Sequence, residues 1–321
     1  MFSFALCLGV LSNEIVEYLL DPLMKGVYAG DVSRLSARSV LKKFFRWEQH
    51  YGSITNGFLK TRKNKTNEEK SDRVFQDLNL TDYKDILEKY AIYYFRDGME
   101  VLAERLVKSL SAMTNVELIQ NQSIDRIEFT PDQEIPVTLL NQSKKKYTAD
   151  HLISAVPSFE LAKMINNQEL SVLQTRLNQI SFVDMVVVNL LYEKENIYPT
   201  DAFGYLIPSR EGSHLLGVLF DTCVRHQIDG KKRGSQLTVM MGGAWYDELR
   251  LGEYNDKQLM NIVRKELKKQ MNLDEKPAFY SISRLNRAIP VRKRFLIVNG
   301  LISSSRITML AMKTCSMTFT R

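Results

Sequence analysis

Glycines inside strand-like segments are the residues whose type and spacing suggest chemistry in this chain, and that chemistry is ligand binding. Gly204 and Gly217 interrupt two apolar segments, and Gly242 and Gly243 end a third. A missing side chain within a strand often marks a bulge or a place where a ligand lies against the backbone. Simple packing of the chain on itself is the alternative, and the sequence leaves both interpretations open.

Metal chemistry is not favoured by the cysteines. Cys7, Cys223 and Cys315 lie far apart without the spacing of metal ligands, and their odd number argues against a disulfide framework. We therefore expect no metal site, and we assign no catalytic side chain.

The glycines belong to four apolar segments that predict one sheet. The segments are residues 185–192, 203–208, 214–220 and 236–245, and turn residues fill the gaps between them. Short gaps favour antiparallel pairing, because a parallel crossover needs about a dozen residues or more. The gap before the last segment is the longest, so its pairing is the least constrained.

The N-terminal part reads as helical. We expect a helix over 13–20 that Asp21-Pro22 stops or redirects, a loop over 24–31, a helix from Ser33 to Trp47 and an apolar segment over 51–59. Lys42, Lys43 and Arg46 alternate with aromatic residues there. They indicate either a helix at a membrane interface or a solvated basic face over packed aromatics.

The rest of the chain alternates strands and helices. The polar stretch 60–72 predicts a linker, and an amphipathic helix follows Asp97-Gly98, after an apolar segment at 87–95. We expect strands at 116–119, 123–129, 136–140 and 147–157, a helix at 161–165, a helix at 255–271, and a strand at 278–284 that ends by 290, with 291–298 as a further candidate strand. Residues 303–321 show no clear period. The middle portion reads as part of a dinucleotide-binding fold without its beginning.

Composition bounds the class of protein. The 321 residues are 44% hydrophobic and 25% charged, as in globular domains, with no apolar run long enough to span a membrane and no evident targeting peptide. The net charge is +7, but nine basic and no acidic residues lie from Lys276 onward, which leaves 35 basic and 37 acidic residues elsewhere. We therefore do not expect a nucleic-acid partner.

Five motifs in order carry a family resemblance. They are residues 25–31 (KGVYAGD) with 35–39 (LSARS), 97–102 (DGMEVL), 149–157 (ADHLISAVP), 202–208 (AFGYLIP) and 239–245 (VMMGGAW). From about Asn13 to Pro290 the chain resembles the protoporphyrinogen oxidase family of flavin-containing, amine-oxidase-like enzymes. The resemblance implies an α/β and α+β fold: a partial Rossmann-like FAD-binding domain of the p-hydroxybenzoate-hydroxylase/amine-oxidase type, an antiparallel-sheet substrate domain and a partial helical membrane-facing domain.

The same resemblance implies a reaction and a pocket. FAD would oxidise protoporphyrinogen IX to protoporphyrin IX in three two-electron steps, with oxygen as acceptor, and the protein would supply the pocket. Gly26 would approach the tetrapyrrole, Phe203 and Leu206 would line its faces next to Gly204, and Met240 would pack nearby, which suits a flat apolar ligand. Without the family, Phe203, Leu206 and Met240 read as ordinary core. The backbone of Ile124 would touch the adenine end of FAD.

The resemblance also sets the expected domains and partners. The domains are a helical membrane-binding part (1–60), a linker with a connecting helix (61–90), a partial FAD-binding domain (91–165), a substrate domain (166–290) and a divergent basic tail (291–321). The expected partners are the tetrapyrrole, a membrane surface contacted peripherally and a second copy in a homodimer, at the mitochondrial inner membrane. Two alternatives stay open: a flavin oxidase of a polyamine or monoamine, and a non-catalytic tetrapyrrole-binding protein.

The chain departs from the family pattern at both ends. No G-x-G-x-x-G turn, the usual cradle of the flavin pyrophosphate, occurs in the sequence. The family's substrate-propionate Arg lies in the same missing part, and the residues after Pro290 do not resemble the family. This pattern predicts a chain truncated at both flavin-binding ends, with a tail from an alternative exon, intron read-through or a faulty gene model. Such a chain would bind flavin poorly, have little activity and aggregate through exposed apolar edges.

Overall fold

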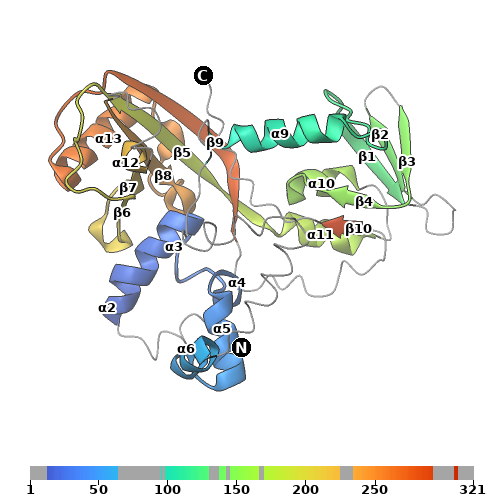
Figure 1. Cartoon of the computed structure of the whole chain (residues 1–321), viewed down its shortest axis with the longest axis horizontal. Coiled ribbons are helices and arrows are strands. Elements are labelled where there is room, and N and C mark those ends of the chain that lie inside the picture. Colours follow the sequence, from blue (N-terminus) through green and yellow to red (C-terminus); the bar gives the residue numbers. More distant parts are fainter. Residues whose placement is uncertain are drawn as a thin grey trace. The chain divides into compact units, whose positions relative to one another are not determined.

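The computed structural model describes residues 13–63, 95, 98–129, 137–141, 145–165, 170–224, 234–291 and 307–309. Two compact units divide the chain: residues 1–40 with 123–321, and residues 41–122 (Figure 1). The first unit contains all the strands found in the described residues. The first boundary between the two units lies at residues 40 and 41, whereas the expected helical domain ends at residue 60. The expected domain limits stay predictions.

A five-stranded antiparallel sheet forms the centre of the first unit, as the four apolar segments predict. Its strands are β5 (Ser181–Tyr192), β6 (Gly204–Leu206), β7 (Leu215–Phe220), β8 (Ser235–Gly242) and β9 (Phe279–Val291). Their order is β6-β7-β8-β5-β9, and every neighbouring pair is antiparallel. The pairing across the longest gap, β7 with β8, is therefore confirmed. The predicted final strand runs on to Val291, and residues 292–298 lie outside the described part.

One face of this sheet is packed against a long helix, α13 (Asp256–Met271). Val188, Val218 and Val239 of the sheet and Leu259 and Val263 of the helix are all 0% exposed and share one core. Fully burying a side chain of this size contributes about 1.5–3 kcal/mol. A capping box fixes the start of the helix: the Gln258 backbone N–H donates to Asn255 Oδ1 at 3.0 Å, and the Asn255 N–H donates to Gln258 Oε1 at 2.9 Å.

The N-terminal helix continues through the point where the sequence predicts a stop. Residues Asn13–Ile15 (α2) lead through a π-helical turn, Val16–Leu20, directly into α3 (Asp21–Tyr28). Pro22 lies in the first α-helical turn after the π-helical turn, in which the Asp21 N–H donates to the Val16 carbonyl five residues earlier. The helix therefore does not stop at Asp21-Pro22, and the loop expected over 24–31 is helical up to Tyr28. The helix ends at Ala29, whose φ of 49° is left-handed.

A second, smaller layer of the first unit contains the strands that the sequence predicts for flavin binding. β1 (Ile124–Phe129), β2 (Val137–Asn141) and β3 (Lys146–Ala149) form an antiparallel sheet, and β4 (Leu152–Ser154) pairs in parallel with β10 (Ile307–Met309). The single strand expected at 147–157 is thus two strands in two sheets. Strand β10 lies within the stretch 303–321, in which the sequence shows no clear period. Helices α10 (Ser158–Met164) and α11 (Ser171–Asn178) complete this layer.

Short helical segments complete the first unit. They are α4 (Ala37–Val40), η4 (Ser209–Glu211), α12 (Asp221–Val224), η5 (Gly243–Trp245) and η6 (Leu251–Glu253). The helix expected from Ser33 to Trp47 is broken, because Leu35 forms a β-bridge, α4 covers only Ala37–Val40, and the next helix starts at Lys42.

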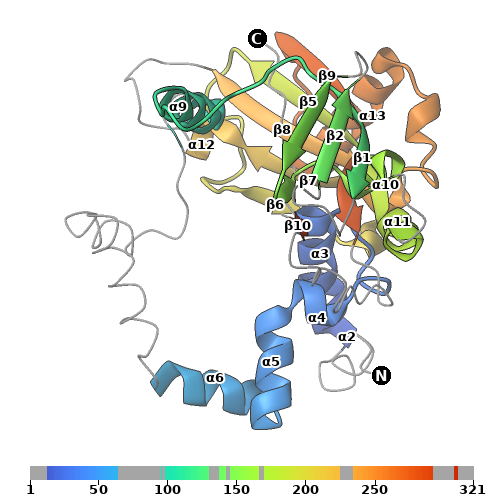
Figure 2. The ribbon, with the colours of Figure 1, turned by 90° about the vertical axis from the view of Figure 1, so that its right-hand side faces the viewer.

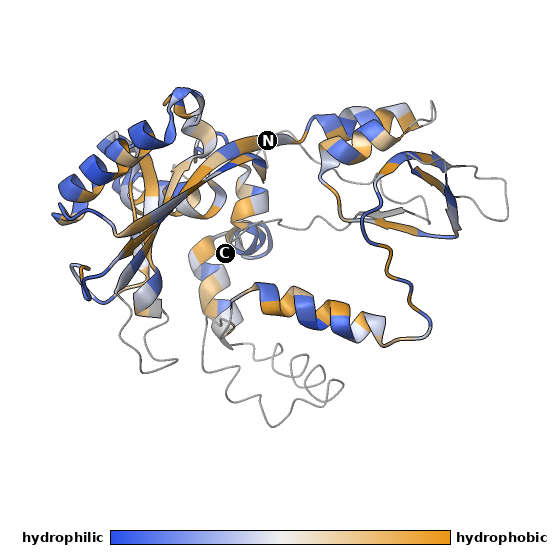
Figure 3. Cartoon of the chain, turned by 90° about the horizontal axis from the view of Figure 1, so that it is seen from above, coloured by the Kyte–Doolittle hydropathy of each residue, from blue (hydrophilic) through white to orange (hydrophobic). Residues whose placement is uncertain are grey.

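The second unit is helical in its described residues. It contains α5 (Lys42–Tyr51), α6 (Ile54–Lys63) and α9 (Glu100–Ser111), and both apolar and polar residues line α9 along its length (Figure 3). Helix α9 confirms the amphipathic helix predicted after Asp97-Gly98. Residues 116–119 form no strand, so that prediction is wrong. The start of the predicted linker is helical up to Lys63, and residues 64–94, with most of the segment expected at 87–95, lie outside the described part.

None of the helices among the described residues is long and apolar enough to cross a membrane.

Candidate functional site

The candidate site is the face of the five-stranded sheet opposite α13. Residues that pair directly across antiparallel strands lie on the same face. The pairs Leu206–Gly217, Gly217–Met240, Met240–Val187 and Val187–Ser283 therefore form one row across all five strands. The Leu206, Met240 and Val187 side chains are only half-buried, whereas most of the α13 face is fully buried. This row, called the apolar row below, is a mainly apolar and half-buried surface.

Helix α3 borders this face at β6 and β7 (Figure 2). Gly26 lies directly against Leu206, and a Cβ atom at Gly26 would overlap the Leu206 side chain. A Cβ at Gly217 would come within 2.8 Å of the same side chain. Two glycines from distant parts of the chain thus make room for Leu206. Gly26 and Leu206, expected separately to approach a ligand, contact each other.

Two sets of hydrogen bonds attach α3 to the sheet. The Asp21 carboxylate is 7% exposed and accepts from the Ser209 backbone N–H at 2.6 Å and from the Ser209 hydroxyl at 3.0 Å. At the other end of the helix, the Ala244 N–H donates to the Ala29 carbonyl at 2.8 Å. Because both ends are held, the position of Gly26 over Leu206 is fixed.

Lys25, beside Gly26, is a buried cation that sequence reasoning missed. The residue is 3% exposed, and its ammonium lies 5.0 Å from the centre of the Trp245 ring. Burial lowers the Lys25 pKa, and the carboxylates of Asp21 and Glu266 oppose that shift. A single lysine in a helical pattern carries no sequence signal of burial, since most lysines on helices are solvated.

Phe203 and Gly204 lie at the end of the site, before and at the start of β6. The Phe203 side chain is 54% exposed, and its carbonyl accepts from the Phe220 N–H at 3.0 Å. Gly204 has a φ of 147°, and a Cβ there would overlap the Val218 carbonyl. Backbone packing therefore explains why this position is a glycine.

The glycines at the end of β8 are also explained by packing. Gly242 has a φ of 100° and Gly243 a φ of 64°, and a Cβ at Gly243 would overlap the Ala29 carbonyl. Of the two interpretations that the sequence leaves open, close packing of the chain accounts for Gly204, Gly217, Gly242 and Gly243.

Ile124, expected to touch the adenine end of FAD, lies away from the apolar row in the second layer. It begins β1, pairs with Asn141 and is half-buried against the core of Ile127 and Leu161. Helix α10 packs on β1. The Phe159 ring of α10 meets the Phe182 ring of β5 with centroids 5.0 Å apart, so this layer adjoins the larger sheet.

One observation supports a cofactor beside this layer. The Ser158 hydroxyl at the start of α10 is buried, at 7% exposed, and it has no hydrogen-bond partner among the described residues. A buried unpaired hydroxyl is unusual and suits a polar group of a bound molecule. The residues present fit the side of FAD expected near Ile124. A glycine turn for its pyrophosphate does not occur in the sequence.

Metal chemistry finds no support in the described part of the chain, where no cluster of three or more His, Cys, Asp or Glu could hold an ion. Cys223 is a free thiol, and Cys7 and Cys315 lie outside the described residues.

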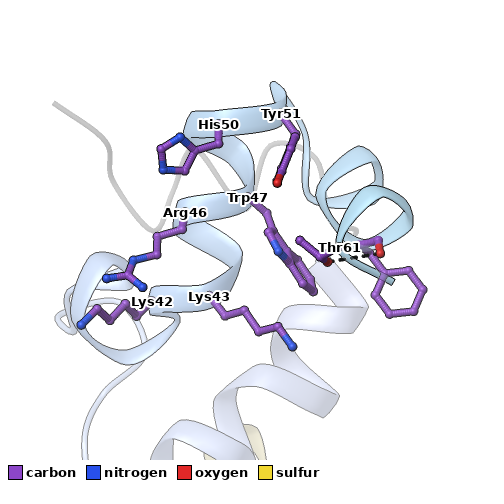
Figure 4. A pocket seen from close by; sticks show the side chains of 8 residues that line it. Lys42, Lys43, Arg46, Trp47, His50, Tyr51 and Thr61 are labelled. Atoms are coloured by element: carbon purple, nitrogen blue, oxygen red, sulfur yellow. Dashed lines mark hydrogen bonds between the residues drawn. The ribbon is translucent and has the colours of Figure 1, made fainter. Parts of the chain in front are cut away.

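A separate pocket lies between α5 and α6 in the second unit (Figure 4). Its volume is about 610 Å³. Cationic and aromatic side chains line it, and Lys43 lies 4.9 Å from the centre of the Trp47 ring. Phe58 meets the same indole edge-on at 6.0 Å between centroids. The lining residues are Lys42, Lys43, Arg46, Trp47, His50, Tyr51, Phe58 and Thr61. Its basic and aromatic side chains are the ones that suggest an interfacial helix in the sequence.

Comparison with known proteins identifies the family. The model of the flavin containing amine oxidoreductases matches residues 8–295. The chain belongs to this family. Membership in this family implies FAD as the cofactor and oxidoreduction as the class of reaction. The resemblance drawn from the five motifs is thereby confirmed at the level of the family.

Several relatives of this chain are named as one particular enzyme of the family. Protoporphyrinogen oxidase of Bos taurus is 29% identical over 282 residues, which cover 87% of this chain and 56% of the relative. Protoporphyrinogen oxidase of Homo sapiens is 30% identical over 239 residues, covering 74% and 47%. The chain thus spans about half the length of the curated relatives it matches.

Solved structures confirm the fold of this family member. A candidate protoporphyrinogen oxidase from Exiguobacterium sp. 255-15 matches with a TM-score of 0.66 at 17% identity, covering 93% of this chain and 59% of the other. Reduced UDP-galactopyranose mutase matches with a TM-score of 0.57 at 11% identity, covering 90% and 56%. The predicted mixed fold, with its antiparallel sheet and FAD-binding layer, is confirmed. The membrane-facing role of the helical unit and the individual site residues stay predictions.

Proposed function

We propose that this chain is a weakly active or inactive form of an enzyme that oxidises protoporphyrinogen IX to protoporphyrin IX with FAD and oxygen, and that the tetrapyrrole lies on the apolar row. The names of its curated relatives support this substrate. The observation that carries the proposal is the row itself, in which Leu206, Met240 and Val187 present half-buried apolar side chains in one line across the sheet.

A flat apolar macrocycle suits this surface. Neighbouring strands lie about 4.8 Å apart, so the row from β6 to β5 offers a strip roughly 14 Å long with few protruding side chains. Gly217, between Leu206 and Met240, has no side chain of its own, and the Leu206 side chain lies against it. Contacts with ring faces are mostly dispersion and apolar burial, which this surface supplies.

The protein's part in the reaction is binding and orientation. Each step would remove two electrons and two protons from the macrocycle, and bound FAD would supply the redox chemistry by which oxygen accepts the electrons and becomes hydrogen peroxide. In our proposal Gly26 and Leu206 hold one edge of the macrocycle, Phe203 and Gly204 border it, and Met240 contacts its face. Ile124 contributes backbone contacts at the adenine end of FAD, and the Ser158 hydroxyl contributes a hydrogen bond to a polar group of the cofactor.

The proposed location is the mitochondrial inner membrane, with peripheral contact through the second unit. The basic side chains around the α5–α6 pocket support this, together with apolar side chains that are 41% (Phe44), 50% (Phe58) and 54% (Leu59) exposed. Cationic and apolar side chains on one helical surface favour the interface of an anionic bilayer. A homodimer and a place in haem biosynthesis belong to the same proposal.

The test combines flavin retention with a choice of reductants. The purified chain is incubated with FAD and desalted, and its visible spectrum is followed under anaerobic conditions after addition of protoporphyrinogen IX, a polyamine or a monoamine. Because no glycine turn for the pyrophosphate occurs in the sequence, we expect the chain to retain little flavin, and we expect the porphyrinogen alone to bleach the flavin that is retained. Bleaching by an amine alone would overturn the substrate assignment. Porphyrin binding without flavin retention would favour the non-catalytic alternative.

A matched pair of variants links any activity to the apolar row. Met240→Ala removes an apolar side chain from the candidate site, while Ile262→Ala removes one from the partly buried margin of the opposite, α13-covered side. We expect Met240→Ala to weaken tetrapyrrole binding and Ile262→Ala to leave it unchanged. An equal effect of both would show that stability rather than the row limits binding.

A further inference from the structure

A second row, which includes the polar residues Thr238, Asn189 and Ser281, lies beside the apolar row on the same face of the sheet. The pairs Gly204–Leu219, Leu219–Thr238, Thr238–Asn189 and Asn189–Ser281 run across the five strands, two residues along each strand from the apolar row. Residues two apart on a strand point to the same face, about 6.8 Å from each other. Thr238 and Asn189 therefore border the surface on which we place the tetrapyrrole.

Three side chains at this position form a connected group. The Thr238 hydroxyl lies 2.9 Å from Asn189 Oδ1 and 2.7 Å from Asp221 Oδ2. Thr238 is 4% exposed, whereas Asn189 is half-buried. A threonine hydroxyl has a single proton, so it cannot donate to both neighbours at once.

Chemistry fixes the direction of these hydrogen bonds. An ionised carboxylate only accepts, and a hydrogen bond to it is stronger than one to an amide, so the Thr238 proton goes to Asp221. The Asn189 amide keeps its shape when its oxygen and nitrogen exchange places, and with the nitrogen toward Thr238 it donates to the hydroxyl oxygen. The Asn189 oxygen then occupies the far side of the amide, where no hydrogen bond joins it to another described residue.

We infer that Asn189, oriented by Thr238 and Asp221, determines specificity by accepting a hydrogen bond from a pyrrole N–H of the reduced tetrapyrrole. The inference rests on the proposed function and names the polar contact of the same site. The apolar row contacts the body of the macrocycle, and Asn189 supplies an acceptor at its margin. Ligand pockets of this kind are mostly apolar, and a small number of polar groups in them orient the ligand.

This arrangement distinguishes substrate from product. In a porphyrinogen, saturated carbons join the pyrroles, so each ring can tilt and direct its N–H toward an acceptor on one face. In the conjugated product the macrocycle is flat, and its remaining N–H groups point to its centre. Asn189 therefore favours the reduced ligand, which assists release of the oxidised one.

The test compares binding of both ligands by the unaltered chain and by variants. Protoporphyrinogen IX under anaerobic conditions and protoporphyrin IX are titrated separately, with quenching of tryptophan fluorescence as the readout, because Trp245 borders the site. Asn189→Leu keeps a similar volume without the acceptor, and Thr238→Val removes its support. Ser281→Ala, in the same row on β9, is the matched control.

We expect Asn189→Leu to weaken porphyrinogen binding about tenfold, the size of one lost hydrogen bond, and porphyrin binding less than twofold. Thr238→Val should act in the same direction, and Ser281→Ala should change neither. The inference, but not the proposed function, would be overturned if an Asn189→Leu variant of unchanged melting temperature lost equal affinity for both ligands or lost none. If the unaltered chain binds neither ligand, the proposed function itself fails.

Discussion

Gly26 of α3 lies against the Leu206 side chain of β6, so a residue near the start of the chain shapes one edge of the candidate site. Helix α3 is held at both ends, through Asp21 to Ser209 and through Ala29 to Ala244. The helix therefore cannot easily move away from Leu206. The relationship between the two residues is the structural basis for the first prediction.

Replacing Gly26 by Ala should disturb the site through Leu206. The added methyl group overlaps that side chain, and such overpacking typically costs about 1–3 kcal/mol of stability. Urea unfolding measures the loss, and a second substitution, Leu206→Ala, should recover part of it by removing the overlapped atoms. Gly252→Ala is the control, because its Cβ would meet Tyr246 at 3.5 Å, an ordinary contact. Equal losses for Gly26→Ala and Gly252→Ala would contradict this account.

Replacing Asp21 by Ala should loosen α3 from the sheet. The substitution leaves the Ser209 N–H and hydroxyl without their acceptor, and an unpaired buried polar group costs about 1–3 kcal/mol. The control is Glu17→Ala, which removes an ion pair with Arg210 at 2.8 Å whose partners are about half exposed. Exposed pairs contribute at most about 1 kcal/mol. A larger loss for Glu17→Ala than for Asp21→Ala in chemical unfolding would refute the anchoring role of Asp21.

Replacing Lys25 by Met should raise stability at neutral pH. Burial lowers the Lys25 pKa below its ordinary 10.5, so the folded state binds this proton less tightly than the unfolded state does. The stability of the unaltered chain therefore rises as pH increases from the folded-state pKa to 10.5. The advantage of Lys25→Met should accordingly be largest below the folded-state pKa and shrink toward 10.5. Unfolding curves of both proteins across this range test the idea, and a constant difference between them would count against it.

Alkaline pH should destabilise the fold through Tyr192. Burial raises the pKa of its phenol from 10.0 to about 12, and the hydroxyl has no hydrogen-bond partner in the part of the chain that the structure describes. Because this pKa is raised in the folded state, the contribution of Tyr192 to the free energy of unfolding is complete below pH 10 and is lost as the pH rises toward about 12. Tyr192→Phe should remove this part of the pH dependence and cost little at neutral pH. Superimposable alkaline stability profiles of the two proteins would contradict the assignment.

Local sequence determined those elements whose signals lie within a few residues of each other. The apolar segments predicted β5 to β8 and their antiparallel pairing, because short turn-rich gaps leave little choice of direction. The helix α13 followed from apolar residues at helical spacing. The family, too, was readable in the sequence, since its motifs keep their order along the chain.

Only the tertiary structure decided features that depend on residues far apart in the chain. The helix continues through Asp21-Pro22 with the Asp21 carboxylate bound to Ser209, 188 residues later. Gly204 is a glycine because the Val218 carbonyl approaches it, and Gly26 because Leu206 does. Lys25 is buried by the packing of α3 near Trp245. Periodicity reports which face of an element is apolar, but it does not specify which distant residue will lie against that face.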